Sequence, residues 1–223
     1  MSIEFYERLG AEGLAARTSA AWDEQIVTRL HEMILPGRRV LDAGCGYGRI
    51  AIPMAQAGYD VTGLDHSDAL LRVARERAEA ANVAVRWIRE TMCRMPLPDD
   101  SFDVVICLWS AFNELLEEEE QIAAVKEMHR VLRPRGWALI EGPIFTPAIA
   151  DEIASGKRHG RENRLSMDVV AGLPNPHYCH DRESLAYIME RAAVAPFQVY
   201  TDGWAGRPRQ FLRIQRTAGP VQR

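Results

Sequence analysis

The sequence predicts an α/β protein built on a mostly parallel sheet. Five short, β-rich apolar runs alternate with helical patterns between Arg38 and Pro143, as in consecutive βαβ units. The runs are apolar almost throughout, which is typical of strands that are covered on both faces. The expected strands are residues 38–44, 59–65, 83–90, 102–110 and 136–143.

Helical patterns with recognisable ends separate these strands. Ser67 suits the N-cap of a helix over residues 68–81, whose leucines and alanines fall on one face. The run 116–136 opens with glutamates and closes on arginines, which match the two ends of a helix dipole. Residues 181–193 predict a further helix, and 195–202 and 209–217 predict two last strands.

Length and composition limit the organisation of the chain. Its 223 residues suit one domain over 1–223, with two helices in 1–37 as an N-terminal cap. The segment 144–181 has weak periodicity and is too long for an ordinary connection, so we expect a substrate-side insert or lid.

Charge and hydropathy argue against several classes of partner. The formal charge of -4 gives no basic face for nucleic acid. No apolar run reaches the roughly 18 to 20 residues of a membrane span, and the first residues do not resemble a signal peptide, so we expect a cytoplasmic protein. The four cysteines lie far apart, so we expect reduced thiols and no metal site.

A glycine-rich turn follows the first strand in "LDAGCGYGRI". Gly44, Gly46 and Gly48 give the spacing G-x-G-x-G, one residue short of the dinucleotide pattern G-x-G-x-x-G. Asp42 ends the strand, where ligands bind in such sheets. Its carboxylate would repel a pyrophosphate but would suit a ligand with an ammonium and a sulfonium.

A second carboxylate, Asp65, ends the second strand. An acid at this position can accept two hydrogen bonds from a ribose diol. The alternative is a structural acid that caps the next helix. The two acids together predict a ribose-bearing, cationic ligand.

Four motifs in order resemble those of the class I methyltransferases that use S-adenosylmethionine. They are "VLDAGCGYGRIAIPMAQAG", "VTGLDHSDALLRVA", "MPLPDDSFDVVICLWSAFNEL" and "MHRVLRPRGWALIEGP". The resemblance implies a Rossmann-like three-layer sandwich with a seven-stranded, mostly parallel sheet, whose last strand, 209–217, runs antiparallel. It also implies S-adenosylmethionine as the cofactor.

The resemblance assigns cofactor contacts to particular positions. It places Asp42, Gly44 and Gly46 at the methionine end, Asp65 and His66 at the ribose, and Met92 and Cys93 at the adenine. Leu108, after the fourth strand, would offer its carbonyl to the amino group. Many members carry an aspartate just before the adenine-facing pair, where this chain has Glu90 and Thr91. Which of the two reaches the adenine amino group stays open.

The methyl acceptor should lie at the ends of the fourth and fifth strands, below the insert. Transfer needs an acceptor atom held about 3 to 3.5 Å from the methyl, and a base only if that atom must lose a proton early. We expect acceptor contacts from Trp109, Asn113, Tyr178 and Tyr6, with Glu114 a further candidate, and catalytic roles for His177, His180 and Glu141. Alternatively, Trp109 covers the cofactor and the loop histidines are simply exposed.

The expected function is methyl transfer to an O, N or C atom of a small molecule, a secondary metabolite included. One alternative is a methyltransferase for tRNA or protein, supported by Arg158, Arg161 and Arg164 in the insert. The other is a non-catalytic, cofactor-binding partner subunit. The oligomeric state is left open, a homodimer included.

Overall fold

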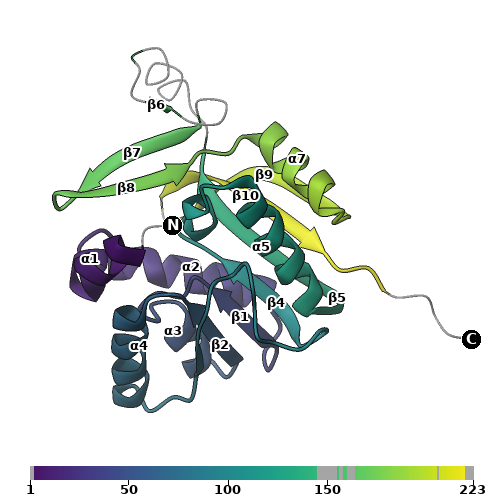
Figure 1. Cartoon of the computed structure of the whole chain (residues 1–223). Coiled ribbons are helices and arrows are strands. Elements are labelled where there is room, and N and C mark those ends of the chain that lie inside the picture. Colours follow the sequence, from purple (N-terminus) through teal and green to yellow (C-terminus); the bar gives the residue numbers. More distant parts are fainter. Residues whose placement is uncertain (1–2, 145–154, 156–157, 160–163, 205, 219–223) are drawn as a thin grey trace, which may run out of the picture.

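A seven-stranded sheet in the order β3-β2-β1-β4-β5-β10-β9 forms the centre of the computed structural model (Figure 1). The structure describes residues 3–144, 155, 158–159, 164–204 and 206–218. The strands of this sheet are β1 (Arg39–Ala43), β2 (Asp60–Asp65), β3 (Arg86–Arg89), β4 (Phe102–Cys107), β5 (Leu132–Pro143), β9 (Phe197–Trp204) and β10 (Arg207–Gln215). Strand β10 pairs antiparallel with both β5 and β9, and the other pairings are parallel. The predicted fold class and the antiparallel last strand are confirmed.

Helices cover both faces of this sheet. They are α1 (Ile3–Ala15), α2 (Ala20–Met33), α3 (Ala51–Gln56), α4 (Asp68–Ala80), the 3-10 helix η1 (Ala111–Glu114), α5 (Glu118–Val131) and α7 (Arg182–Ala192). Helices α2 and α3 pack on one face and α5 and α7 on the other, while α1 lies against α4 (Figure 1). Ser67 caps α4 by accepting a hydrogen bond from the Leu70 amide, as predicted.

The alternation of side chains along β1 explains its two-sided burial. Val40 packs into the core beneath α2 and α3, whereas Leu41 and Ala43 pack into the core beneath α5 and α7. All three are completely buried. A strand buried on both faces reads as a continuous apolar run, which is why the sequence located it.

The junction of α5 and β5 differs from the prediction. The helix ends at Val131, and β5 begins at Leu132 rather than at Gly136. Leu132 pairs with Phe102, and the register then shifts before Trp137 pairs with Val104. Pro134 cannot donate a helical hydrogen bond, so the arginine-rich end of the pattern extends the strand instead.

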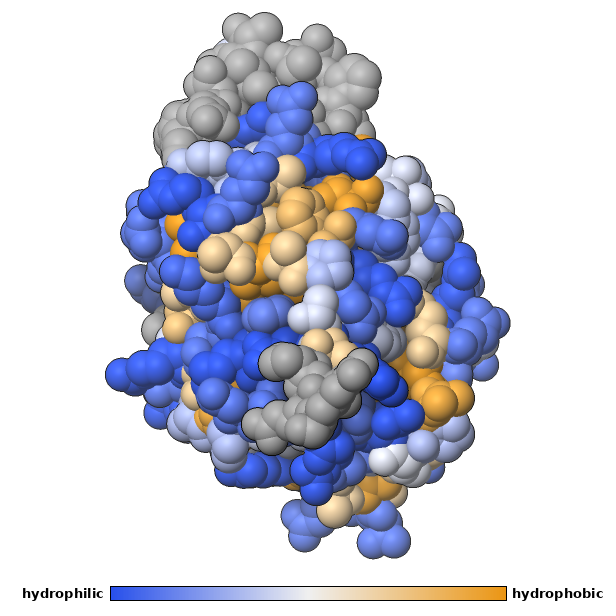
Figure 2. Space-filling view, turned by 90° about the vertical axis from the view of Figure 1, so that its right-hand side faces the viewer, coloured by the Kyte–Doolittle hydropathy of each residue, from blue (hydrophilic) through white to orange (hydrophobic). Residues whose placement is uncertain are grey.

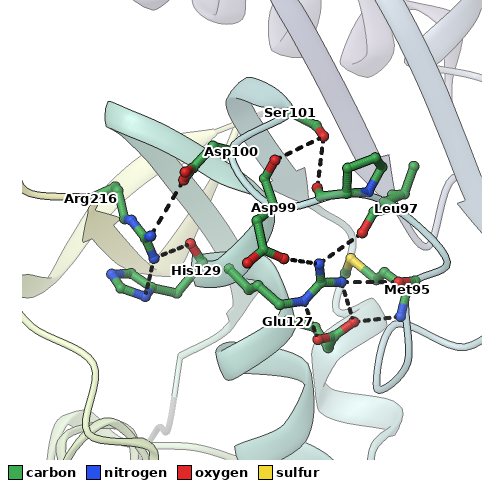
Figure 3. A network of polar contacts seen from close by, with 10 residues as sticks. Met95, Leu97, Asp99, Asp100, Ser101, Glu127, His129 and Arg216 are labelled. Carbon is green, nitrogen blue, oxygen red and sulfur yellow. Dashed lines mark hydrogen bonds and ion pairs between the residues drawn. The ribbon is translucent and has the colours of Figure 1, made fainter. Parts of the chain in front are cut away.

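A polar network fixes the segment between β3 and β4 onto α5 (Figure 3). The Arg130 guanidinium donates to the carbonyls of Met95 at 3.0 Å and Leu97 at 2.7 Å. It also pairs with Glu127, whose carboxylate accepts the Met95 amide at 2.6 Å. The network therefore positions a loop that has no regular structure of its own.

Part of the predicted insert forms a second, three-stranded sheet in the order β6-β7-β8. Its strands are β6 (Arg158–His159), β7 (Leu165–Val170) and β8 (Leu173–Tyr178). The last two form an antiparallel hairpin that projects over the same side of the molecule as α1 (Figure 1). The sequence had predicted no strand here, because prolines interrupt β8.

The molecular surface is mixed in character. Figure 2 shows a face that is largely hydrophilic, with a hydrophobic patch in its upper half. Within the described residues, no helix is both long and apolar enough to cross a membrane.

Candidate active site

A cavity of about 340 Å³ opens at the carboxyl ends of β1, β2 and β4. In a parallel sheet, ligands bind outside the carboxyl ends of the strands, where the connections that follow two neighbouring strands lead to opposite faces of the sheet. Its floor comes from the glycine-rich turn after β1, and its upper wall from α1, η1 and the β7–β8 hairpin. Ten of the predicted cofactor or acceptor residues line it: Asp42, Gly44, Gly46, Asp65, His66, Met92, Leu108, Trp109, Tyr6 and Glu114.

The glycine turn needs residues without side chains. Gly44 and Gly48 have positive φ angles of 85° and 81°. A Cβ on Gly44 would lie 2.6 Å from the Ala111 Cβ, and one on Gly48 would lie 2.8 Å from the Trp87 ring. Gly44 therefore keeps the cavity floor open toward η1, whereas Gly48 serves packing.

Asp42 is a buried acid at the cavity floor, with an exposed fraction of 4%. Burial and the neighbouring Asp65 carboxylate raise the pKa of Asp42 to about 7, and Arg49 opposes the shift. Such a carboxyl becomes stable as an anion when a cation is brought to it. This suits a ligand that carries an ammonium group.

Asp65 organises the turn as well as lining the cavity. Its carboxylate accepts the amides of Gly46 at 2.8 Å and Ser67 at 2.9 Å. Asp65 therefore has a structural role in the turn, whereas Ser67 caps α4. A carboxylate has further lone pairs for a ligand. The neighbouring His66 has its buried Nε2 without a hydrogen-bond partner among the described residues.

The two predicted adenine contacts point in different directions. Met92 lines the cavity, but the Cys93 thiol donates to the Glu120 carbonyl at 3.3 Å and does not line it. Glu90 is held by Arg94 at 2.8 Å and by the Thr91 amide. Met92 directly precedes the loop that the Arg130 network fixes.

Trp109 enters the cavity from a strained turn. Trp109 and Ser110 both have positive φ angles, 56° and 66°. The Trp109 amide donates to Glu141 at 2.6 Å, and Arg209 pairs with the same carboxylate and donates to the Ser110 hydroxyl. Glu141 therefore supports the turn from behind, outside the cavity.

Arginine and a second tryptophan enclose the Trp109 ring. The ring stacks on Trp22 at 5.9 Å, and the Arg49 guanidinium lies 4.1 Å from its centroid. The arrangement makes a rigid aromatic wall.

The predicted acceptor residues separate into two groups. His177 lines the cavity, with its Nδ1 3.8 Å from the Asp168 carboxylate. By contrast, Asn113, Tyr178 and His180 do not line it. Asn113 donates to the Tyr178 carbonyl at 2.8 Å, and the buried His180 ring contacts the Tyr178 ring and the Ser184 hydroxyl. These three residues join η1, β8 and α7, and they hold the upper wall in place.

Several cavity residues were not predicted. They are Leu14, Arg17, Thr18, Cys45, Tyr47, Arg49, Ile50, Leu70, Ser110, Ala111, Pro143, Asp168, Asn175, Arg207 and Arg209. Asn175 could have been found, because it lies two residues before His177 and side chains two apart share a face of a strand. Asp168 could not, since it depends on the hairpin register that pairs it with Asn175.

The insert arginines have local partners or lie outside the described residues. Arg164 pairs with Asp181 at 2.7 Å. Arg161 lies outside the described residues, as does the side chain of Arg158.

Comparison with known proteins identifies the family. Residues 40–136 match the model of the methyltransferase domain family. Residues 40–136 form a class I S-adenosylmethionine-dependent methyltransferase domain. The match covers the glycine turn, both acids of the floor and strand β4, so the matched segment supplies the floor of the cavity.

Two curated relatives and one solved structure are similar to this chain. It is 31% identical to the demethylmenaquinone methyltransferase of Geobacillus kaustophilus over 60% of this chain and 56% of the relative. It is 40% identical to a ubiquinone biosynthesis O-methyltransferase of Alkalilimnicola ehrlichii over 47% of this chain and 41% of the relative. The chain spans about half the length of the curated relatives it matches.

The solved structure has the same fold. It is the 1,6-didemethyltoxoflavin-N1-methyltransferase of Burkholderia thailandensis with bound S-adenosylhomocysteine. The TM-score is 0.68 at 16% identity, over 96% of this chain and 87% of that one.

Proposed function

We propose that this protein transfers a methyl group from S-adenosylmethionine to a small molecule. The observation that supports it best is the pair of buried acids, Asp42 and Asp65, on the floor of a cavity that continues to a separate polar wall. The floor is acidic where the cofactor carries its positive charges, and the upper wall offers a second set of groups to an acceptor.

The residues present fit the cofactor. Asp42 would hold its ammonium group, because a ligand cation would offset the burial and the Asp65 repulsion that raise the pKa of this carboxyl. Asp65 would accept the ribose hydroxyls, and the unpartnered His66 Nε2 would serve the same end of the ligand. Met92 would contact the adenine, and the Leu108 carbonyl would accept from the amino group. When bound, the cofactor supplies an electrophilic methyl on a sulfonium.

The upper wall would orient the acceptor and exclude water. Tyr6, Trp109 and His177 enter it from α1, the end of β4 and β8. We therefore propose α1 and α2 as a cap and the segment 144–181 as an acceptor-side lid on a single domain. A cytoplasmic location is part of the same proposal.

The acceptor class is supported by the relatives. Two of them are named for quinone-pathway methylation, one of them on oxygen. We propose a small cyclic acceptor, comparable in size to a quinone ring. Arg164 was one of the arginines that favoured a tRNA or protein acceptor. It forms an ion pair with Asp181, so its charge is partly neutralised and that alternative is less well supported.

Calorimetric titration with S-adenosylhomocysteine tests the cofactor site. We expect the wild-type protein to bind it, and Asp65→Asn to weaken binding by about tenfold or more, about 1.4 kcal/mol. Asp68→Asn is the matched control, because Asp68 is exposed in the first turn of α4 and does not line the cavity. It should leave the affinity within about twofold.

Absence of binding to the wild-type protein would refute the proposed function. The acceptor class is tested with methyl-labelled cofactor against demethylated quinones, unmodified tRNA and a cell protein extract. Label in tRNA or protein alone would refute a small-molecule acceptor.

A further inference from the structure

Glu114 is a cavity carboxyl in a firmly held position. It is the last residue of η1 and directly follows Asn113. The side-chain amide of Asn113 donates to the Tyr178 carbonyl of β8 at 2.8 Å. On its other side, the Leu115 carbonyl accepts a hydrogen bond from Gln121 at 2.7 Å. Both neighbours are thus anchored, while the Glu114 side chain points into the cavity.

The surroundings of Glu114 favour its protonated form at neutral pH. Burial raises the pKa of Glu114 to about 8, and the nearby His177 opposes the shift. The Tyr6 hydroxyl donates to Oε1 of Glu114. Beyond these contacts, Asp168 lies 3.8 Å from His177, and the His66 ring lies 5.9 Å from the Tyr6 ring. A carboxyl in this state can take a proton and give it up close to neutral pH.

The other cavity acids differ from Glu114 in their contacts, position or exposure. Asp65 accepts two backbone amides, and Asp42 lies at the end of β1 on the floor. Asp168 is more than half exposed.

The His177 imidazole has several polar neighbours of its own. Burial disfavours its imidazolium, but contacts with Cys179, Asp168 and the Asn175 backbone outweigh burial, so the pKa of His177 is raised. Among the cavity carboxyls, Glu114 lies on the upper wall beside Tyr6 and is less exposed than Asp168, so it is the carboxyl best placed to meet an acceptor.

Asn175 gives an independent indication of the ligand. Its side chain is 6% exposed, it lines the same cavity, and its Oδ1 has no hydrogen-bond partner among the described residues. A buried acceptor oxygen without a donor costs free energy, which a ligand with its own donor would recover. The cavity is thus built for a molecule that carries hydrogen-bond donors.

We propose that Glu114 is the proton acceptor of the reaction and that the methyl acceptor is a hydroxyl-bearing molecule. Its reacting O–H donates to Glu114, and a second donor on the same molecule reaches Asn175 Oδ1. This inference rests on the proposed function, because it assigns the upper wall of the same cavity.

The step balances without a further reactant. The Glu114 carboxylate takes the hydroxyl proton, and an oxygen lone pair forms the new C–O bond. The C–S bond breaks and its electron pair stays on sulfur, which neutralises the sulfonium. Glu114 then loses the proton to solvent. Tyr6, which donates to the ionised form, acts as a positioning residue.

The first test measures the titration of Glu114 directly. In the complex with S-adenosylhomocysteine, the carboxyl ¹³C signal that Glu114→Gln removes should titrate near pH 8. Tyr6→Phe should move that titration upward, because the ionised form loses a donor. A titration below about pH 6 would overturn the proposal whatever the acceptor.

The second test separates chemistry from binding. Glu114→Gln should lower kcat about 10²-fold or more. Its affinity for S-adenosylhomocysteine should stay within about twofold, since Glu114 lies on the upper wall. Glu117→Gln, at an exposed glutamate three residues on, is the matched control and should behave as wild type. The wild-type kcat should rise to a plateau above about pH 8, and that rise should be absent in Glu114→Gln.

Two further results would overturn the inference. One is turnover of acceptors without an exchangeable hydrogen as fast as their hydroxylated counterparts. The other is loss of cofactor affinity in Glu114→Gln in parallel with kcat, which indicates a structural role. Either can occur while the wild-type protein binds the cofactor, so a failure here is distinct from failure of the proposed function.

Discussion

Asp42 shows how a residue can favour ligand binding at the expense of folding. Its carboxyl is buried beside Asp65, so the folded protein keeps it protonated up to about pH 7. A ligand ammonium pairs with the ionised form only, so binding below pH 7 must first expel a proton. We expect the affinity for S-adenosylhomocysteine to be level above about pH 7 and to fall up to tenfold per pH unit below it. Calorimetry between about pH 5.5 and 8.5 measures this.

Asp42→Asn provides the control. Its affinity should be weak and should lack the fall centred near pH 7. The wild-type pKa is raised above its unfolded value of 3.8, so the contribution of Asp42 to stability is present below that value and is lost as pH rises through about 7. The variant should therefore need more urea to unfold than the wild type at pH 8, and the difference should shrink in acid. A wild-type affinity that is flat across this range would contradict the argument.

At the scale of elements, a single α5 side chain holds the loop between β3 and β4. Arg130 satisfies the carbonyls of Met95 and Leu97 and pairs with Glu127. We expect Arg130→Met to lower the free energy of unfolding by roughly 2 to 3 kcal/mol, because it leaves these carbonyls and the Glu127 carboxylate without their hydrogen-bond donor. Urea unfolding measures the loss, and weaker cofactor binding should accompany it through Met92.

Arg133→Met is the matched control for this network. Arg133 is also an arginine at the α5–β5 junction, but its contacts with Asp100 and Asp103 are 3.3 and 3.5 Å long and partly exposed. Its loss should cost under about 1 kcal/mol. An equal loss of unfolding free energy in the two variants would show that the Arg130 network stabilises the protein no more than an ordinary surface contact does.

The elements differ in how well sequence predicts them. The strands of the central sheet are apolar on both faces, and their patterns stand out in isolation. Strand β8 instead carries Pro174 and Pro176 at alternate positions, and it lies at an edge of its sheet. Proline is tolerated there because that edge needs no donors, but the residues on their own predict a loop.

At the scale of the molecule, the floor of the cavity was predictable and its upper wall was not. Asp42 and Asp65 end adjacent parallel strands, so the fold class alone brings them together. Tyr6 and Glu114 are 108 residues apart, and they meet because α1 and η1 happen to close over the same cavity. Nothing local distinguishes Glu114 from Glu141, which is held by Arg209 behind the wall.

This division between floor and wall has a dynamic consequence. The central strands are covered on both faces, whereas α1 and the β7–β8 hairpin lie over the cavity, and the hairpin exposes Met167 and Val169. Amide exchange should therefore be slowest in β1, β4 and β5 and much faster in α1 and the hairpin.

Ligand binding should couple the two parts. Tyr6 and Leu14 of α1 line the cavity, and the Glu7 carboxylate accepts a hydrogen bond from the Ser67 hydroxyl at 2.8 Å, two residues after Asp65. S-adenosylhomocysteine should therefore slow exchange in α1 as well as in the glycine turn, as measured by mass spectrometry. Helix α7 lines no part of the cavity and should be unchanged. Protection confined to the glycine turn would mean that α1 is only packed against α4, whereas protection that extends to α1 makes it part of the cofactor site.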